Sequence, residues 1–468
     1  MSHNDVRGRT VSIGALMTAL MAAIFAFQLN ASMLAPALTV MGQQLNATQA
    51  EIGVTQTGFF AAAALFSLFL PRWGDLAGRK KIMLGMLIAT GVGCVVSALA
   101  TNVTVLGIGR IIQGTSGPIV PLALIMLHQQ VTDNAHYAKL MSILTAVNGG
   151  IAGLDALLGG WLAETYGFRS VFWTMAGVAV LAVIGVALGT VESRSSESQK
   201  MDWPGVPALL VVLGGLYFAF NEMGKLGGAN WGLVAGLIVL AAVAFVVFWR
   251  IETNAHAPLV TTHYMKQRRT WALLLTTLLT MTGVFAVMNG ILPNLAQDPE
   301  AGAGMSAGIV SWWTLSPYAI AGLLMGPVAG QLAARWGFRK VLRGGLVLSV
   351  MGLVVFAIFL HHPAPAFLLV FSIFLGLTYA GTCNIMLNGL GVVLSPRDNQ
   401  GYLPGMNSGA FNLGAGLSFA IIFAIQQALQ AASGPVAGYR WAVLVGAIIM
   451  ALAFAASFLI PHPDEVEK

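Results

Sequence analysis

The sequence has 468 residues, of which 57% are hydrophobic and only 9% are charged, and its formal net charge is +6. Soluble domains carry about 25% charged residues, so the shortage of charge excludes a water-exposed domain of any size. Apolar segments of about 18–25 residues are long enough to cross a bilayer as helices, whereas a β-barrel needs alternating strands of about 10 residues. We therefore expect an all-α integral membrane protein.

The hydropathy pattern predicts fourteen membrane-spanning helices. The polar segment 1–10 leads directly into an apolar stretch, which we interpret as a retained first span and not as a cleaved signal peptide. The expected spans, in chain order, are residues 12–38, 52–71, 82–100, 103–128, 140–163, 170–191, 203–221, 231–250, 271–295, 307–334, 341–360, 366–392, 405–430 and 441–461. Because the number is even, both termini are expected on one side.

The distribution of Lys and Arg predicts which side that is. With the N-terminus in the cytoplasm, the inner segments hold 19 of the 23 Lys and Arg residues, and the outer loops hold only Arg169, Lys225 and Arg440. The remaining one, Arg110, lies within a span. The positive-inside rule then places both termini in the cytoplasm of a bacterium, with the chain in the inner (plasma) membrane.

One loop sequence occurs twice in the chain. Residues 71–83 and 330–342 both carry a glycine followed by basic residues, and aligning Gly78 with Gly337 gives an offset of 259 residues. This offset is longer than the length of six spans with their loops. The two additional spans expected at 203–221 and 231–250 account for the extra residues. We expect a six-plus-two-plus-six arrangement, with a first bundle at 1–191, two inserted helices within 192–265, and a second bundle at 266–468 that faces the first.

Several motifs in this order resemble the major facilitator superfamily, and specifically its fourteen-span drug:proton antiporter family. Residues 75–81 resemble the family's loop motif, 106–114 its fourth-span motif with an intramembrane arginine, and 158–162 the end of its fifth-span motif. Residues 202–205 and Glu252 with Pro258-Leu259 resemble the borders of the inserted helices. The resemblance implies two pseudo-symmetric helical bundles that transport by alternating access.

Three positions depart from the family pattern. Asn30 stands where the family usually has an acid, and Asp155-Ala156 replaces the usual Gly-Pro pair of the fifth span. Pro71 and Leu76 replace a glycine and an arginine of the loop motif. The first two changes alter the proton-handling and antiport signatures of the family.

Only two charged residues lie deep within the expected spans, namely Arg110 and Asp155. Each lies about 10–12 Å below the outer edge of the membrane, and Asn30 is expected at a similar depth. A lone charge in the membrane costs about 2.5–3.5 kcal/mol on insertion scales, so contact between the two charges is favoured. We expect Asp155 to carry the proton, beside Arg110 and Asn30. The alternative is a fixed ion pair that only orders helix packing.

The repeated loop is the candidate conformational latch. The resemblance implies that its acid, Asp75, holds the two bundles closed on the cytoplasmic side, and Ala334 stands at that position in the second copy. The alternative is ordinary positive-inside charge. The expected latch residues are Asp75, Gly78, Arg79, Lys80, Arg335 and Arg339.

Polar and aromatic residues of the spans are candidates for substrate contact, although a buried amide in a membrane helix often only joins helices. The candidates are Gln113, Asn148, Asn289, Trp312, Trp313, Tyr379, Asn384, Asn407 and Asn412. The second bundle offers amides and aromatics but no embedded charge, so a neutral, zwitterionic or amphipathic substrate fits best.

We therefore expect a proton-coupled secondary transporter of a small organic compound, with drug efflux as the main interpretation and metabolite uptake by proton symport as the alternative. A membrane receptor or an enzyme on a transporter scaffold is a remote alternative, because the spans hold no cluster of acids or histidines. We expect no enzyme activity, no metal, no cofactor and no nucleic-acid partner. The expected partners are the substrate, the proton and the lipid bilayer, and the expected state is a monomer.

Overall fold

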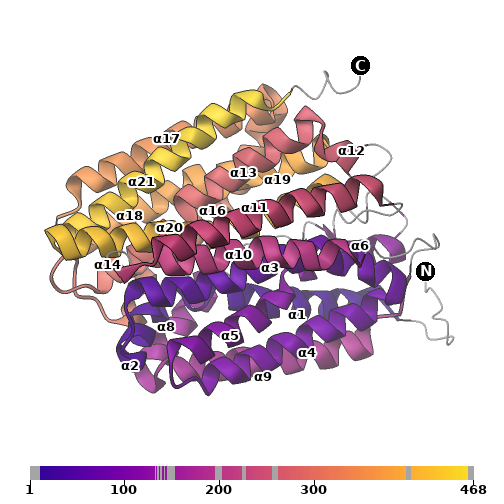
Figure 1. Cartoon of the computed structure of the whole chain (residues 1–468), viewed down its shortest axis with the longest axis horizontal. Coiled ribbons are helices and arrows are strands. Elements are labelled where there is room, and N and C mark those ends of the chain that lie inside the picture. Colours follow the sequence, from indigo (N-terminus) through magenta and orange to yellow (C-terminus); the bar gives the residue numbers. More distant parts are fainter. Residues whose placement is uncertain are drawn as a thin grey trace.

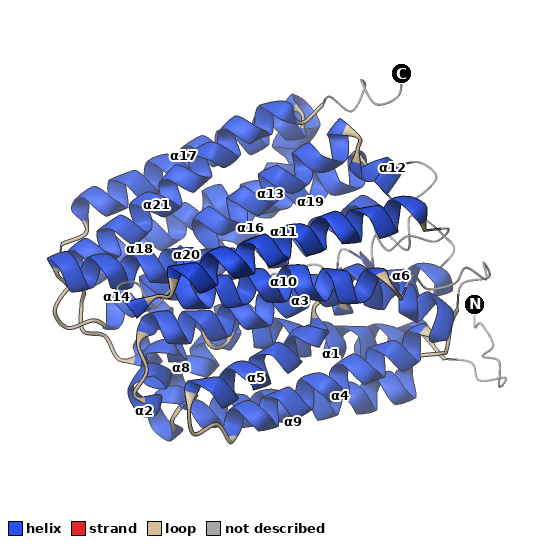
Figure 2. Cartoon of the chain, in the orientation of Figure 1, coloured by secondary structure: helices blue, strands red, loops and turns tan. Residues whose placement is uncertain are grey.

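The computed structural model describes residues 11–131, 133, 136, 140–141, 143–144, 153–194, 203–223, 228–255, 262–361, 363–396 and 402–461. Within these residues the chain is helical and has no strand (Figure 2). The long helices run side by side as a bundle, and the start of α1 and the end of α21 lie at the same end of it (Figure 1).

The first group of helices comprises α1 Ile13–Ser32, α2 Leu38–Leu45, α3 Gln49–Ala77, α4 Arg79–Ala98, α5 Val103–Gln113, α6 Ile119–Gln130, α8 Leu154–Tyr166 and α9 Phe168–Gly189. Two helices follow, α10 Gly205–Met223 and α11 Trp231–Asn254. The second group comprises α12 Thr262–Met265, α13 Arg268–Ala286, α14 Leu292–Gln297, α15 Ala307–Trp313, α16 Leu315–Trp336, α17 Phe338–Phe359, α18 Pro365–Leu375, α19 Asn384–Val393, α20 Tyr402–Ser433 and α21 Pro435–Ala456. Short 3₁₀ segments (η1 Ala35–Ala37, η2 Gly114–Ser116, η7 Ser457–Leu459) and π-helical segments (η5 Val287–Ile291, η6 Gly376–Cys383) join or extend them.

Twelve helical stretches of the described residues are long and apolar enough to span a membrane. Two of the fourteen predicted spans are not among them. The span predicted at 140–163 is interrupted by positions outside the described residues, 142 and 145–152, with helical residues before them and α8 after them. Helix α10 contributes the shorter apolar helix Gly205–Phe220. The structure therefore supports twelve spans and does not support the count of fourteen.

The two groups of helices meet along two seams, where α3 packs against α20 and α8 packs against α15. Glycines bring the backbones close at both seams. A Cβ added at Gly53 of α3 would lie 3.0 Å from the ring of Phe423, and one at Gly160 of α8 would lie 2.2 Å from the carbonyl oxygen of Ala307. Helix α10 packs against α11 and also touches α3 and α20, so it contacts both groups.

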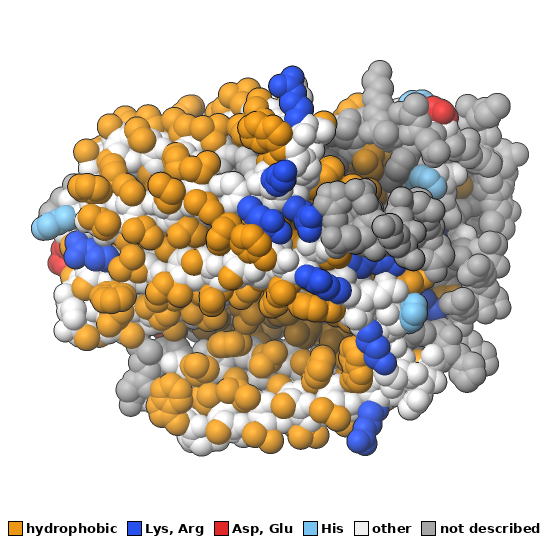
Figure 3. Space-filling model, turned by 90° about the horizontal axis from the view of Figure 1, so that it is seen from above, with side chains coloured by type: hydrophobic (Ala, Val, Ile, Leu, Met, Phe, Trp, Pro, Cys, Tyr) orange, Lys and Arg blue, Asp and Glu red, His pale blue; other side chains and the backbone are white. Residues whose placement is uncertain are grey.

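The outer face of the molecule suits a hydrocarbon environment. Figure 3 shows hydrophobic side chains over most of one face and most of the visible Lys and Arg side chains in a band toward the end where α1 begins and α21 ends. This separation of charge from apolar surface is the pattern that the positive-inside rule describes.

Candidate coupling and gating sites

Arg110 of α5 is fully buried and is surrounded by neutral partners. Its Nη1 donates to the backbone oxygen of Asn30 at 3.1 Å and to Oε1 of Gln113 at 2.5 Å, and its Nη2 donates to Oε1 of Gln56 at 2.8 Å. The guanidinium carbon lies 4.2 Å from the ring centroid of Phe59. Two amide dipoles, one carbonyl and one aromatic face therefore stabilise this charge.

The end of α1 supplies the carbonyl that Arg110 uses. Pro36 has no N–H to continue the helical ladder, and α1 ends at Ser32 before the chain turns into η1. The last carbonyls of a helix lack intrahelical donors and form the negative end of its dipole. Asn30 belongs to this last turn, so the arginine satisfies a carbonyl that the helix end leaves open.

Asp155 lies in the first turn of α8 and its side chain is 4% exposed. One of its carboxylate oxygens accepts a hydrogen bond from the hydroxyl of Ser32 in α1. The side-chain amide of Gln28 donates to the same hydroxyl oxygen at 3.0 Å. Three side chains on two helices thus form one polar chain, half-buried at Gln28 and buried at the acid.

The expected ion pair between Arg110 and Asp155 is absent, because α1 lies between them. Arg110 binds α1 at Asn30, and Asp155 binds it at Ser32, two residues further along. Two residues correspond to a rotation of about 200° around a helix, so the two charges contact opposite sides of α1. Both contacts lie in the last turn of α1, but each charge has its own neutral partners. The side-chain amide of Asn30 does not reach Arg110 and donates instead to the backbone oxygen of Ala26 at 2.8 Å.

Asp155 also lies beside the seam between the two groups of helices. The backbone oxygens of Gly153 and Ala156, which flank Asp155, accept hydrogen bonds from Ser316 at 2.7 Å and Ser311 at 3.0 Å. Both serines belong to the second group, in α16 and α15. A change of charge at Asp155 would therefore act directly next to contacts that join the two groups.

Further hydrogen bonds join the groups at the end away from the chain termini. Oε2 of Glu164 in α8 accepts from the hydroxyl of Ser306 at 2.9 Å and from the backbone N–H of Gly308 at 2.6 Å. The others run from Thr39 to Asn294 at 3.0 Å, from Asn294 to Gln49 at 2.8 Å, from Gln297 to the Pro36 oxygen at 3.2 Å and from the Ala50 N–H to Gln427 at 3.2 Å. In this structure the two groups are thus bonded together at that end.

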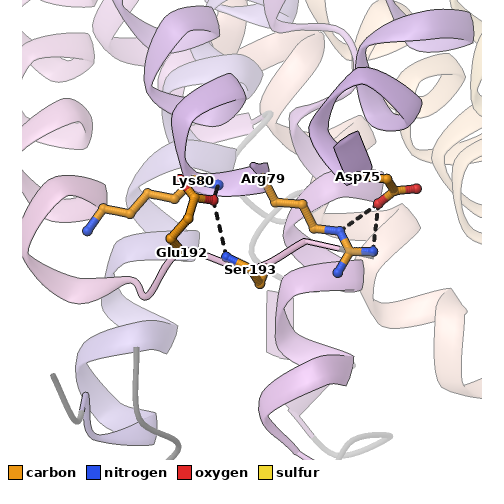
Figure 4. Close-up of polar contacts among 5 residues, drawn as sticks. All are labelled: Asp75, Arg79, Lys80, Glu192 and Ser193. Carbon is orange, nitrogen blue, oxygen red and sulfur yellow. Dashed lines mark hydrogen bonds and ion pairs between the residues drawn. The ribbon is translucent and has the colours of Figure 1, made fainter. Parts of the chain in front are cut away.

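The first copy of the repeated loop fastens α4 to the end of α9 (Figure 4). Arg79 forms an ion pair of 2.6 Å with Asp75, while its backbone N–H donates to the Ser193 oxygen at 3.0 Å. Glu192 accepts from the backbone N–H groups of Lys80 and Ser193, each at 3.1 Å. The Lys80 ammonium donates at 2.7 Å to the backbone oxygens of Ala187 and Thr190. These contacts of the expected latch lie within the first group, and none of them reaches the second.

The second copy is built in a similar way with fewer charges. Gly78 and Gly337, which precede α4 and α17, have φ of +119° and +84°, a conformation that L side chains rarely adopt. Arg339 donates to the Ile460 oxygen at 2.9 Å, next to the end of α21. Arg335 is exposed.

The expected substrate residues have different surroundings in the structure. Gln113 is a partner of Arg110, and it also donates to the hydroxyl of Ser97 at 3.0 Å. Trp312 is 63% exposed on the outside, and Trp313 and Asn384 are half-buried. Asn148 lies outside the described residues.

Three other candidates belong to the packing of the second group. The hydroxyl of Tyr379 donates to the sulfur of Met281 at 2.9 Å, and Asn407 accepts from Thr277 at 2.6 Å. Asn289 donates to the Phe285 backbone oxygen at 3.0 Å. Asn412 is buried in α20.

Sequence reasoning missed four contacts of these sites. Ser32 was not selected because a serine in an apolar helix carries little signal, and Phe59 was not selected because aromatic residues are common in membrane spans. Phe59 lies three residues after Gln56, so both side chains lie on one face of α3. This spacing could have identified Phe59 as a neighbour of the Gln56 partner of Arg110. Glu192 and Glu164 lie at helix ends, where acids usually face solvent.

Among the described residues, no group of three or more His, Cys, Asp or Glu side chains could hold a metal ion. The Lys and Arg side chains lie mainly toward one end, and the buried polar residues lie in small hydrogen-bonded sets.

Comparison with known proteins gives consistent results. The sequence profile described as Major Facilitator Superfamily matches residues 20–418 and 273–468. A protein of Lactococcus lactis named uridine/deoxyuridine transporter is 56% identical over 459 residues, which cover 97% of this chain and 96% of that protein. Multidrug resistance protein 3 of Bacillus subtilis is 25% identical over 303 residues, covering 64% of this chain and 58% of that protein.

Solved structures show the same fold. A variant of the nucleoside transporter NupG superposes with a TM-score of 0.62 at 14% identity, covering 96% of this chain and all of that one. The human organic anion transporter MFSD10 superposes with a TM-score of 0.63 at 13% identity, covering 96% of this chain and 99% of that one.

Proposed function

The chain belongs to the major facilitator superfamily of membrane transporters, and from this premise we propose that it takes up a nucleoside of the uridine type. The observation that carries the proposal is the identity of 56% over 97% of the chain to a uridine/deoxyuridine transporter. The proteins named for multidrug resistance are 25% identical and cover less of the chain. This difference favours the uptake alternative over the drug efflux that the motifs alone suggested. A transporter of this family is not an enzyme.

The second group of helices is compatible with a neutral substrate. Uridine carries no charge at neutral pH, and the described spans of the second group contain amides and aromatic rings with no charged side chain deep inside them. A neutral ring system with several hydrogen-bonding groups needs stacking surfaces and amides more than a counter-charge. This agrees with the substrate class expected from the sequence.

We propose further that the proton gradient drives uptake and that Asp155 carries the proton. The acid is buried, lies between residues whose backbone oxygens bond the second group, and has a hydroxyl partner that can donate to it when it is charged or accept from it when it is protonated. Arg110 and Asn30 then serve to hold the end of α1, to which Asp155 is bonded. No cofactor is needed for this cycle.

We also propose an architecture of fourteen spans, with one bundle at 1–191, two inserted helices within 192–265 and a second bundle at 266–468. Both termini lie in the cytoplasm in this proposal, and the protein works as a monomer. With this orientation, the hydrogen bonds between the groups at the end away from the termini would lie on the periplasmic side, and we propose that this arrangement represents an inward-facing state. The loop of Asp75, Gly78, Arg79 and Lys80, with Arg335 and Arg339, would form contacts between the groups only in the opposite state.

Uptake of radiolabelled uridine into proteoliposomes tests the proposal. An inward-directed proton gradient should drive accumulation of uridine above its external concentration, and an uncoupler should remove that accumulation. Excess unlabelled deoxyuridine should compete with the labelled substrate. If uridine is not transported in either direction while a cationic drug is exported, the nucleoside assignment is wrong and the efflux interpretation replaces it.

A further inference from the structure

A cavity of about 580 Å³ lies beside α10, and neither Arg110 nor Asp155 is among its lining residues. Its walls come from α3 and α5 of the first group, from the inserted helix α10, and from Gln427 of α20. The volume is within the range of about 300–1,000 Å³ that is usual for pockets that bind small molecules. The lining residues therefore come from three parts of the chain: the first group, the inserted helices and the second group.

The cavity opens toward the membrane. Ile108 of α5 and Phe218 of α10 line it, and they are 51% and 56% exposed on helices that face the hydrocarbon of a bilayer. The part of the space between Ile108 and Phe218 is apolar, and water fills such a part poorly because it needs several polar partners. Leaving it empty would forfeit the dispersion contacts of its walls. Membrane lipid is the component that is present at this surface and can fill it.

The lining changes from polar to apolar with depth. Thr48, Glu51 and Thr104 lie within the first turns of α3 and α5 or just before them, at the end away from the chain termini. Ile111 lies eight residues into α5, or about 12 Å below its first residue. A molecule with a polar head at the membrane surface and an apolar tail matches this gradient.

The hydroxyl of Tyr217 indicates that the bound molecule has a polar atom below its polar head group. Its hydroxyl lies 3.4 Å and 4.0 Å from the positions that a Cβ would take at Gly58 and Gly107, and within the described part of the chain it forms no hydrogen bond. A tyrosine in an apolar site usually finds a partner for its O–H group. An ester carbonyl, which lies between the head and the tail of a phospholipid, is an acceptor at this level.

The charge at the mouth selects among phospholipid heads. Glu51 is exposed and lines the cavity, and no Lys or Arg is among the lining residues. A carboxylate attracts an ammonium group and repels a phosphate group that carries net negative charge. This favours a zwitterionic head with a primary ammonium over an anionic head.

We propose that this cavity binds one phospholipid with an ethanolamine-type head, its ammonium group beside Glu51, its ester region near Tyr217 and one acyl chain along Ile108 and Phe218. Gln427, which lines the cavity, also accepts the backbone N–H of Ala50 at 3.2 Å across the seam between the two groups. The lipid thus lies beside a contact that holds this state together, and its binding favours this state.

Native mass spectrometry of the purified full chain tests the site, with phosphatidylethanolamine and phosphatidylglycerol of identical acyl chains as probes. The wild type should retain one phosphatidylethanolamine with about tenfold preference over phosphatidylglycerol, which corresponds to about 1.4 kcal/mol. Gly107→Leu fills the cavity, because only the Tyr217 hydroxyl lies within 4 Å of a Cβ there, and it should abolish retention. Gly236→Leu is the matched control, since its Cβ meets nothing within 4 Å and faces the outside of α11.

Two further variants keep the test decisive where Gly107→Leu does not fold. Glu51→Gln should remove the preference between the two heads, and Tyr217→Phe should weaken retention several-fold with little change in shape. Photo-crosslinking from position 108 should capture phosphatidylethanolamine far more than crosslinking from the exposed position 239. A folded Gly107→Leu that retains the lipid like the wild type, or equal capture from positions 108 and 239, overturns the proposal.

Discussion

Lys80 and Arg339 occupy equivalent positions in the two copies of the loop repeat, and both donate to backbone carbonyls at or just beyond the last helix of their group. Around this common contact the copies differ. The first has the ion pair of Asp75 with Arg79, whereas the second has Ala334 and Phe338 at those positions. The shared contact therefore joins the helix after each loop to the end of the last helix of its group. The additional ion pair of Asp75 with Arg79 is present only in the first copy.

The same asymmetry continues inside the membrane. The first group holds Arg110 and Asp155 on opposite sides of α1, each with a set of hydrogen-bond partners. The described spans of the second group use hydroxyls, amides and aromatic rings, such as Tyr379 with Tyr318, and contain no deep charge. The roles proposed above divide in the same way, with the proton at the first group and most of the substrate contact at the second, and five experiments test this proposed division.

The largest effect is expected from Asp155→Asn. This change keeps the size and the contact with Ser32 but removes the group that titrates, so gradient-driven uptake should fall to the level of empty vesicles. Exchange of labelled for unlabelled uridine, which needs no net proton movement, should persist. Asp155→Glu is the matched control and should keep part of the driven uptake. Full accumulation by Asp155→Asn would place proton coupling elsewhere, with Glu51, Glu164 and Glu222 as the next acids to replace.

Arg110→Leu should mainly reduce stability. It leaves the Asn30 carbonyl and the amide oxygens of Gln56 and Gln113 without their donor, and each buried group left unpaired costs about 1–3 kcal/mol. We expect a total loss of about 3–5 kcal/mol, seen as a lower melting temperature of the purified protein. Arg110→Lys keeps the charge but loses the forked geometry and should lie in between.

The absence of a pair between Arg110 and Asp155 gives a sharper test by double-mutant cycle. Residues that do not touch usually contribute additively to stability, within about 0.5 kcal/mol. The double change Arg110→Leu with Asp155→Asn should therefore destabilise by the sum of the single changes. Strong rescue in the double variant would mean that the two charges pair in a major state other than the one described.

Lys80→Met and Arg339→Met compare the two copies of the loop directly. Each removes charge-assisted hydrogen bonds to backbone oxygens, worth about 1.5–3 kcal/mol when well formed. Lys80 makes two of these bonds in the structure and Arg339 makes one, so Lys80→Met should lower the melting temperature more. Lys340→Met, in the same loop as Arg339, serves as the control for loss of a positive charge. A larger effect of Arg339→Met would show that the second group, not the first, depends more on this fastening.

Much of this arrangement could be predicted from the sequence, because it depends on spacing and on the chemistry of the bilayer. The loop repeat and the positions of most spans follow from the length of apolar segments and from the distribution of charge. The partners of the two charges could not be predicted. Depth along a helix is read from residue number, but the side of α1 that each charge faces depends on how α5 and α8 pack around it.

The substrate residues were the least predictable part, for a related physical reason. An amide that faces a cavity and one that joins two helices have the same sequence signature, and Gln113 and Asn407 turned out to join helices. The proposed lipid cavity shows the same limit. Its lining comes from α3, α5, α10 and α20, which lie far apart in the sequence, so no local pattern marks it.

Asp75→Asn is expected to have the smallest effect on stability and separates two roles of the first loop. The side chain of Asp75 is 34% exposed, and partly exposed ion pairs contribute only about 0.2–1 kcal/mol. If the pair with Arg79 only braces the loop, both the melting temperature and the rate of uptake should change little. If Asp75 instead contacts the second group in the outward-facing state, uptake should fall severalfold while the melting temperature of this state stays the same. Ala334→Asp is the companion variant. Because Phe338 stands where Arg79 would be, the new acid has no partner and should leave both measurements unchanged.

Distances between spin labels on the two cytoplasmic rims would show directly whether Asp75→Asn shifts the population between states. A distance distribution of Asp75→Asn identical to that of the wild type would exclude the latch.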